Sequence, residues 1–273
     1  MQASPQCLDH QYNPLASVPD APALFAVWEA RSAQARGAFD CQLDLRYGLG
    51  PLETLDLFPA PGNKAPVLVF IHGGYWRGSD KRAYGFIAPS FVKKGASVVL
   101  LNYDLCPAVS IRTICGQVDS ALDWVRRNLA AYGGDPAKIV LVGHSAGAHL
   151  AAMALLQRSP TSSKALCISG LFDLAPLRDA PFIRDDLKLS AQDAYDLSPI
   201  HAAPPASATV MTAVGALESE AFHQQTASLQ ASWGTELVPV MDCLPQRNHF
   251  DVLDALADED GLLHARACSL LFA

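Results

Sequence analysis

The stretch VLVGHSAGAHL, residues 140–150, is the part of this sequence that decides the fold. It lies at the end of the apolar run Ile139–Val142, which is typical of a buried central strand. Gly143-His144-Ser145-Ala146-Gly147 follows directly, and the alanine- and leucine-rich residues up to Leu156 predict a helix. A serine between a strand and a helix is the arrangement of a nucleophile elbow, in which a strained turn lifts the hydroxyl clear of the sheet. The sequence therefore predicts Ser145 as a nucleophile.

Further runs of apolar residues predict more strands, and helical patterns separate them. The predicted strands are Val67–Ile71, Ser97–Leu101, Ala165–Ser169, Thr209–Val214 and Glu236–Met241. Continuous apolar runs are typical of parallel strands buried on both faces. From Ile114 to Leu129 apolar residues recur at three- and four-residue steps, and Ala221–Trp233 predicts another helix. This alternation favours the α/β class, with a mostly parallel central sheet and helices on both faces.

The remaining segments differ from this alternation. Gln42–Tyr47 and Glu53–Phe58 alternate apolar and polar residues, which predicts an antiparallel hairpin at the N-terminal edge of the sheet. Residues 1–36, with a helix predicted over Ala23–Ala35, are expected to form an arm packed on the main domain. Residues from about 171 to 205 have no clear period and are a candidate lid over the site. We expect residues 1–273 to form a single domain.

Composition narrows the classes of function. Charged residues make up 17% of the chain and the formal net charge is −7, without a Lys/Arg cluster, which disfavours nucleic acid or an anionic membrane as a partner. The first residues lack the features of a secretion signal, and no apolar run approaches the roughly 18 residues of a membrane span, so we expect a cytoplasmic protein. The seven scattered cysteines form no C-x-x-C pair and are expected to be reduced thiols.

A serine at an elbow needs a base to take its proton and an acid to hold that base. On a sheet of this kind the order along the chain is serine, acid, histidine. His249 is the candidate base because it lies in a loop directly after the last predicted strand. His201, His223 and His264 also follow Ser145, but the first ends the insertion and the others fall within predicted helices, so we interpret them as structural or surface residues.

Glu218 is the candidate acid because it closely follows the strand that ends at Val214, from which a carboxylate can reach the imidazole. Glu220 and Asp242 are neighbouring alternatives. Asp173 is a third alternative because it follows the preceding predicted strand.

Residues 72–76, His-Gly-Gly-Tyr-Trp, are the candidate oxyanion hole, because glycines at the carboxyl end of a strand let the backbone approach a substrate oxygen. The N–H of Gly74 or Tyr75 would be one donor, and the N–H of Ala146 the other. Tyr75 and Trp76, with Phe250 beside the base, are candidate substrate-binding residues for a flat or aromatic substrate, although the first two could equally wedge the loop in place.

The remaining histidines near these motifs do not predict a metal site. We interpret His72 as a structural hydrogen-bonding residue. His144 and His149 flank the elbow but lack the H-E-x-x-H arrangement of a helical zinc site. We therefore expect neither a metal nor a cofactor.

Taken together, these motifs resemble a known family. HGGYW at 72–76, GHSAGAHLAAM at 143–153, SGLFDLAPL at 169–177 and NHFD at 248–251, with Tyr103-Asp104 and Pro107, are similar to kynurenine formamidase (arylformamidase) of the α/β-hydrolase fold. The likeness runs from roughly Pro66 to the C-terminus. It implies hydrolysis of N-formylkynurenine to kynurenine and formate, with Ser145 as nucleophile, His249 as base and the HGGYW loop at the oxyanion hole.

The chain departs from the family at the acid. The family carries Asp in a G-x-x-D-S-P-E-F segment, whereas residues 215–222 read GALESEAF, so that Glu218 occupies the Asp position. Glutamate is one methylene longer and can still hold a histidine.

Two other functions remain alternatives. HGGYW proteins with the same elbow also resemble general carboxylesterases, which act on small acyl esters. A catalytically silent ligand-binding protein on the same scaffold is the alternative from another class, and the presence of Ser145, Glu218 and His249 disfavours it. The expected partner is a small-molecule acyl substrate, and the sequence leaves open whether residues 1–36 seal the pocket or join a second copy in a homodimer.

Overall fold

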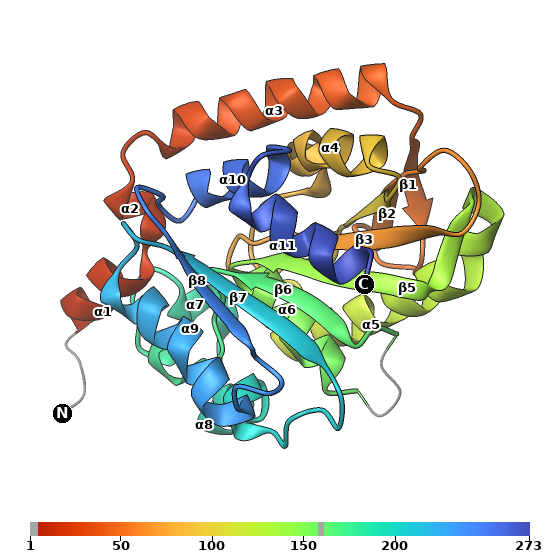
Figure 1. The fold of residues 1–273 in the computed structure, drawn as a ribbon. Helices are drawn as coiled ribbons and strands as arrows, with labels where there is room; N and C mark the ends of the chain where they lie inside the picture. The colour runs from red at the N-terminus through yellow and green to blue at the C-terminus, as the bar shows by residue number, and fades with distance from the viewer. Residues whose placement is uncertain (1–4, 158–160) are drawn as a thin grey trace.

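The computed structural model describes residues 5–157 and 161–273. Within them an eight-stranded sheet has the strand order β1-β2-β4-β3-β5-β6-β7-β8 (Figure 1). The strands are β1 (Gln42–Arg46), β2 (Thr54–Phe58), β3 (Ala65–Ile71), β4 (Ser97–Leu101), β5 (Gly134–His144), β6 (Lys164–Ile168), β7 (Thr209–Gly215) and β8 (Val240–Leu244). β2 pairs antiparallel with β1 and β4, and the other neighbouring strands pair parallel. The predicted parallel sheet with an antiparallel N-terminal edge is confirmed.

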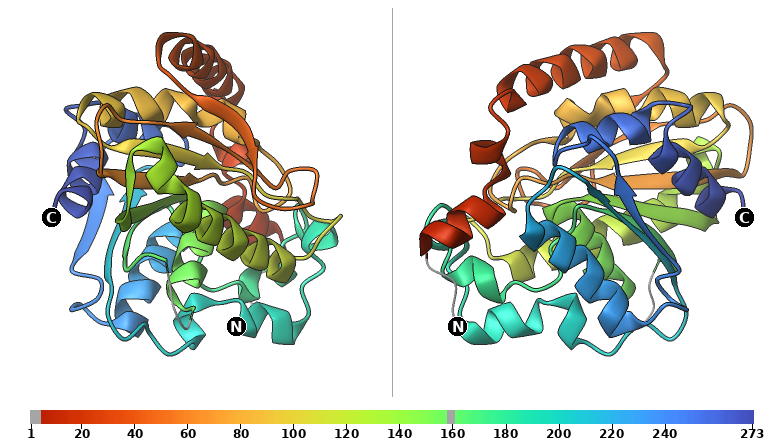
Figure 2. Two further views of the ribbon diagram at one scale, coloured as in Figure 1. Left: turned by 90° about the vertical axis from the view of Figure 1, so that its right-hand side faces the viewer. Right: turned by 60° about the vertical axis from the view of Figure 1, so that its left-hand side comes forward.

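Helices cover both faces of the sheet, as Figures 1 and 2 show. One face carries α5 (Ile111–Asn128), α6 (Ala146–Leu155) and α9 (Glu220–Trp233). The other carries α4 (Ala88–Lys93), α10 (Asp254–Ala257) and α11 (Leu262–Leu271). Successive residues of a strand point to opposite faces, and accordingly Val67 and Val69 belong to the first core while Leu68 and Phe70 belong to the second. Every residue of β3 and β4 is buried for this reason.

Helix α5 illustrates how the sequence pattern produces this packing. The Ser110 hydroxyl accepts a hydrogen bond of 3.1 Å from the Thr113 N–H and caps the helix. The buried residues of α5 are Ile111, Ile114, Gln117, Val118, Ala121, Leu122 and Val125. A 3-10 turn, η2 (Leu129–Tyr132), follows, and Gly133 ends it with a φ of 81°. The predicted apolar face of this helix is confirmed.

The N-terminal residues form two short helices and one long helix. These are α1 (Pro5–Tyr12), α2 (Pro14–Ser17) and α3 (Ala21–Ala38). Helix α1 packs against α9, and α3 packs on η1 (Lys81–Ile87), where Trp28 stacks on Phe86 with ring centroids 5.3 Å apart. These residues therefore lie on the body of the protein along two of its sides.

The segment 171–205 contains η3 (Ala175–Arg178), α7 (Arg184–Leu187), α8 (Ala191–Asp196) and η4 (Pro199–His201). Its apolar residues, among them Leu171, Phe172 and Leu177, are fully buried in the same core as α5 and α6. The apolar residues of this segment thus fix it to the core of the domain, although they are not spaced with the periodicity of one helix.

The last strand lies later than the sequence predicts. It was expected over Glu236–Met241, but β8 begins at Val240, paired with Met211 of β7, and ends at Leu244. Residues 235–237 form a turn, and Pro239 has no N–H to offer a strand ladder. The turn and the proline therefore delay the strand by four residues.

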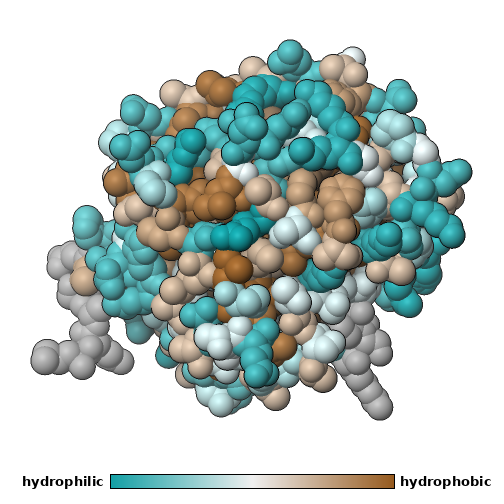
Figure 3. Space-filling model, viewed as in Figure 1, coloured by the Kyte–Doolittle hydropathy of each residue, from teal (hydrophilic) through white to brown (hydrophobic). Residues whose placement is uncertain are grey.

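Hydrophilic and apolar residues are interspersed over the face of the molecule that Figure 3 displays. In the part of the chain that the structure describes, no helix combines the length and the apolar character needed to cross a membrane.

Candidate active site

Ser145 lies at the tight turn between β5 and α6, with φ 56° and ψ −122°. A positive φ strains a residue that carries a Cβ, so the turn must be held from outside. The Ser145 N–H donates to the Ile168 carbonyl at 2.8 Å. A Cβ on Gly147 would lie 2.0 Å from the Ile71 carbonyl oxygen, and one on Gly143 would lie 2.2 Å from that of Gly147. The strand and the helix therefore pass too closely for any residue but glycine at these two positions.

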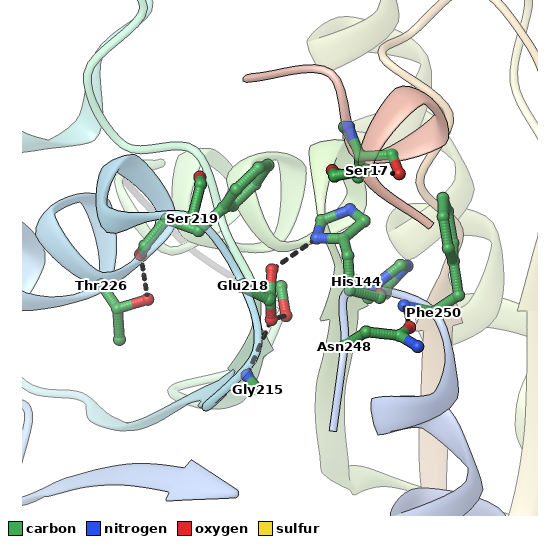
Figure 4. Close-up of polar contacts among 12 residues, drawn as sticks. Ser17, His144, Gly215, Glu218, Ser219, Thr226, Asn248 and Phe250 are labelled. Carbon is green, nitrogen blue, oxygen red and sulfur yellow. Dashed lines mark hydrogen bonds and ion pairs between the residues drawn. The ribbon is translucent and has the colours of Figure 1, made fainter. Parts of the chain in front are cut away.

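His249 and Glu218 form a buried hydrogen-bonded pair. His249 Nδ1 lies 2.6 Å from Glu218 Oε2, and the side chains are 4% and 1% exposed. Glu218 Oε1 accepts a hydrogen bond from the Ser169 hydroxyl at 2.6 Å and another from the Gly215 N–H at 2.7 Å, the latter drawn in Figure 4. Burial alone would raise the pKa of Glu218, but His249 and these two donors outweigh burial, and the pKa lies below its usual value. An ionised carboxylate only accepts, so Nδ1 carries the proton and Nε2 is left to act as a base.

His144, which precedes Ser145, also contacts the main chain of His249. His144 Nε2 lies 2.7 Å from the main-chain carbonyl of His249, and the two imidazole rings are 4.8 Å apart. Burial lowers the pKa of His144 to about 3, so this ring is neutral and its Nε2–H donates to the carbonyl. Ser145 and His249 line the same cavity. The end of β5 and the loop after β8 are thus brought together at the carboxyl edge of the sheet.

The other candidate acids are engaged elsewhere. Asp242 forms an ion pair with Arg266 at 2.8 Å, and Glu220 accepts a hydrogen bond from Gln224. The Asp173 carboxylate accepts from the main-chain N–H of Ala175. The histidines set aside in the sequence, His201, His223 and His264, do not line the cavity.

The HGGYW loop packs directly against the elbow, because a Cβ on Gly73 would lie 2.9 Å from the Ser145 Cβ. Gly74, Tyr75 and Trp76 have successive positive φ values of 105°, 52° and 55°. Glycine adopts a positive φ readily, but the backbone at Tyr75 and Trp76 is strained and must be held by contacts with its surroundings. Within residues 5–157 and 161–273, the N–H groups of Gly74, Tyr75 and Ala146 donate to no protein acceptor. These donors are therefore available to a ligand beside Ser145.

His72 lies beneath this loop, between the rings of Tyr84 and Tyr103 at 5.9 and 4.4 Å. Its Nε2 lies 2.9 Å from the Asn102 side-chain oxygen, and the Tyr103 hydroxyl donates to the His72 carbonyl at 2.8 Å. These contacts agree with the structural interpretation of His72.

The expectation that Trp76 binds substrate is wrong. Its side chain is fully buried, does not line the cavity, and packs edge-on against the ring of His149 at 4.9 Å. The left-handed backbone at Tyr75 and Trp76 directs the indole behind the loop, toward α6. Tyr75 and Phe250, in contrast, both line the cavity.

The cavity has a volume of about 890 Å³, within the range of small-molecule sites. Its aromatic lining comprises Phe25, Trp28, Tyr75, Tyr84, Phe182 and Phe250. Residues 13–15 of the arm close one side, and Phe182 of the segment 171–205 closes another. Of these aromatic residues the sequence predicted Tyr75 and Phe250, but it did not predict that Phe25, Trp28, Tyr84 and Phe182 line the cavity. Among the described residues no group of three or more His, Cys, Asp or Glu is arranged to hold a metal ion.

A mostly parallel sheet with a strained serine after its central strand, and a carboxylate-bound histidine after its last strand, defines an α/β-hydrolase. Residues 55–170 match the family model described as BD-FAE. The kynurenine formamidase of Danio rerio is 30% identical over 244 residues, which cover 84% of this chain and 82% of that protein. The chain belongs to the kynurenine formamidase family, and it is a hydrolase.

Two further similarities lie outside formamidases. A proposed thioesterase from Silicibacter sp. tm1040 has a solved structure that covers 96% of this chain and 97% of its own, with 30% identity and a TM-score of 0.85. Esterase LipQ of Mycobacterium tuberculosis is 41% identical over 119 residues, which cover 41% of this chain and 28% of that protein.

Proposed function

We propose that this protein is an arylformamidase that hydrolyses N-formylkynurenine to kynurenine and formate. The observation that carries the proposal is the meeting of Ser145 with the Glu218–His249 pair in one cavity with aromatic walls. A formyl group needs almost no acyl pocket, while its aryl amine needs a wide one, and this cavity is wide. Membership in the kynurenine formamidase family supports the same substrate.

The first half of the reaction forms an acyl-enzyme. His249 Nε2 takes the proton of the Ser145 hydroxyl, and the oxygen attacks the formyl carbon. The N–H of Ala146, with that of Gly74 or Tyr75, donates to the oxyanion that develops. His249 then gives its proton to the aryl nitrogen, the C–N bond breaks, and the arylamine leaves the formyl ester on Ser145.

The second half repeats these steps with water. His249 takes a proton from the water, whose oxygen attacks the ester carbonyl, and the same N–H groups stabilise the second oxyanion. Collapse of this intermediate returns the proton to the Ser145 oxygen and releases formate. Glu218 stays ionised throughout and stabilises the imidazolium that forms twice.

Ser145→Ala tests this mechanism. We expect turnover of N-formylkynurenine to fall by several powers of ten, because the nucleophile and base act as one unit. A serine-directed fluorophosphonate should label the wild-type protein and not the variant, which also separates the enzyme from a silent ligand-binding protein. Circular dichroism checks that the variant is folded. Undiminished hydrolysis by Ser145→Ala contradicts the proposal.

Carboxylesterase activity is the second candidate, and the similarity to Esterase LipQ favours it. The same residues would catalyse ester hydrolysis, so the substrate decides between the two. We would measure kcat/KM for N-formylkynurenine beside p-nitrophenyl esters of rising acyl length. A rate that peaks at longer acyl chains, with slow hydrolysis of the formamide, supports the esterase.

We further propose that the arm and the segment 171–205 act as walls of one catalytic domain, since both contribute residues to the cavity. We also place the enzyme in the cytoplasm. The free thiols of Cys41, Cys106, Cys115, Cys167, Cys243 and Cys268 support this location.

A further inference from the structure

The inward side of α3 forms one wall of the cavity. Phe25, Trp28, Glu29 and Arg36 all line it, and their spacing places them on one side of the helix. Phe25 packs edge-on against Phe250, the neighbour of the base, with ring centroids 5.0 Å apart. Trp28 and Phe25 are thus the aromatic part of this wall, and Glu29 and Arg36 are its charged part.

Arg36 is fixed in place. Its Nη1 donates to the main-chain carbonyl of Arg82 at 2.7 Å, and a Cβ on Gly85 would lie 3.2 Å from the same atom. One turn earlier, the Ser32 hydroxyl donates to the Ala83 carbonyl at 2.8 Å and joins α3 to η1. A guanidinium has five N–H donors. Most N–H donors of the Arg36 guanidinium have no acceptor among the described residues. The group is therefore a positioned cation that can donate further hydrogen bonds to a ligand.

The other charged side chains of the cavity have partners. Arg77 forms an ion pair with Asp186, and Arg82 lies 3.6 Å from Asp44. The Asp80 carboxylate accepts hydrogen bonds from the Arg82 N–H and from Asn102. In the described part of the chain, by contrast, neither Glu29 nor Arg36 has a partner of opposite charge. Glu29 is exposed and Arg36 is partly buried, so one anion and one cation at the cavity wall are open to a ligand.

We propose that Arg36 and Glu29 bind the zwitterionic head of the leaving group, with the guanidinium on a carboxylate and the Glu29 carboxylate on an ammonium. Arg36 follows Glu29 by seven residues on the same side of α3, about 10 Å along the helix axis, so one ligand head with two opposite charges can lie between them. The aromatic wall between this pair and Ser145 holds the aryl ring. The pair would thereby determine specificity for the amino acid part of the substrate proposed above. This inference rests on the proposed function, since kynurenine carries an α-amino acid.

Two substrates and three variants of the full chain test the site. The substrates are N-formylkynurenine and 2-formamidoacetophenone, which keeps the aryl ketone but lacks the amino acid. Arg36→Gln and Glu29→Gln should each lose about tenfold or more in kcat/KM for N-formylkynurenine, mainly through KM, because charge-assisted hydrogen bonds are lost. Both should stay within about twofold of wild type on 2-formamidoacetophenone. Arg82→Gln is the matched control, an arginine of the same cavity with its own partner, and should keep the wild-type preference.

Equal losses on the two substrates, or no loss on either, overturn the charged site. A loss with Arg36→Gln alone overturns the role of Glu29. Should wild type hydrolyse only esters, the proposed function fails separately. The same variants are then compared on O-acetyltyrosine and 4-methylphenyl acetate, a pair that again differs by the amino acid head, and an unchanged preference between them overturns the charged site.

Discussion

The hydroxyl of Tyr75 donates a hydrogen bond to the main-chain carbonyl of Tyr12, 63 residues earlier in the chain. The adjacent Gln11 accepts from the Ser219 hydroxyl through its main-chain carbonyl, and from the Ala221 N–H through its side chain at 3.0 Å. The arm thereby connects the HGGYW loop to the residues that follow Glu218. The space between the arm and the Glu218–His249 pair is about 10 Å³, room for about one water molecule. On this side the arm therefore leaves little room for solvent beside Glu218 and His249.

Tyr75→Phe removes this connection and keeps the ring. We expect kcat to fall by about tenfold, because the loop of positive-φ residues loses a hydrogen bond that holds its N–H donors in place. KM should change little. Steady-state kinetics measures both, with Tyr195→Phe on the exposed side of α8 as the control. An unchanged kcat would show that the hydroxyl does not position the oxyanion hole.

Ser169→Ala removes one donor from Glu218. Ser169 lowers the pKa of this carboxylate, so the variant should take up a proton at a higher pH than wild type. The loss in kcat/KM of the variant relative to wild type should consequently be larger at about pH 5 than at about pH 8. A pH series of kcat/KM measures this, with the exposed Ser120→Ala as the control. A loss of equal size at every pH contradicts an effect through the charge of Glu218.

Lys81→Met tests a buried ion pair at the antiparallel edge of the sheet. Lys81 Nζ lies 2.6 Å from the carboxylates of Asp56 and Asp44, and the side chains of Lys81 and Asp56 are 1% and 2% exposed. We expect Lys81→Met to lower the free energy of unfolding by about 3–5 kcal/mol, because Asp56 is left buried without its partner. The double variant Lys81→Met, Asp56→Leu should recover most of that loss. Urea denaturation measures both.

The exposed pair of Lys93 and Glu259 supplies the control. Lys93→Met should change the free energy of unfolding by no more than about 1 kcal/mol. A double variant as unstable as Lys81→Met alone contradicts the assignment of the loss to an unpaired carboxylate.

Two buried histidines predict a loss of stability in acid. Burial lowers the pKa of His144 to about 3 and that of His149 to about 4, while an unfolded histidine titrates near about 6.5. Below about pH 6.5 these two histidines are protonated in the unfolded chain but stay neutral in the folded chain. Stability is therefore fully present above about pH 6.5 and falls as the pH approaches 4 and then 3.

His149→Gln keeps a donor for the Leu197 carbonyl and should flatten part of this fall. Urea denaturation of both proteins at about pH 7 and at about pH 4.5 measures how much the free energy of unfolding falls. The exposed His10→Gln is the control. If His149→Gln leaves the slope of stability against pH unchanged, the acid sensitivity comes from other groups.

The parts of the fold that the sequence predicted well depend on neighbouring residues. The strand, turn and helix around Ser145 follow from a buried apolar run, two glycines and a helical pattern that lie within a few turns of one another. β8 was placed too early because it is an edge strand whose residues alternate between half-buried and exposed, and its start depends on Pro239. Patterns of burial are weakest at such edges.

The parts of the site that the sequence missed depend on distant residues. The position of Trp76 follows from a left-handed backbone and from His149 on another helix, and neither is visible in the pentapeptide. Ser169 donates to Glu218, which lies 49 residues later in the chain. The Tyr12 carbonyl accepts from the hydroxyl of Tyr75, which lies 63 residues later. Chain order sufficed to propose Glu218, since the order of serine, acid and histidine is a property of the whole sheet.

Helices α1 and α2 have eight and four residues, too few to stay helical in isolation, and α1 is held by hydrogen bonds with Tyr75, Phe182 and Ser219. We therefore expect α1 and α2 to unfold together, separately from the sheet, and at a lower free energy than global unfolding requires. Dilute urea should then abolish turnover before circular dichroism detects any melting. An assay of activity would in that case report on local opening of these two helices and underestimate the resistance of the protein to global denaturation.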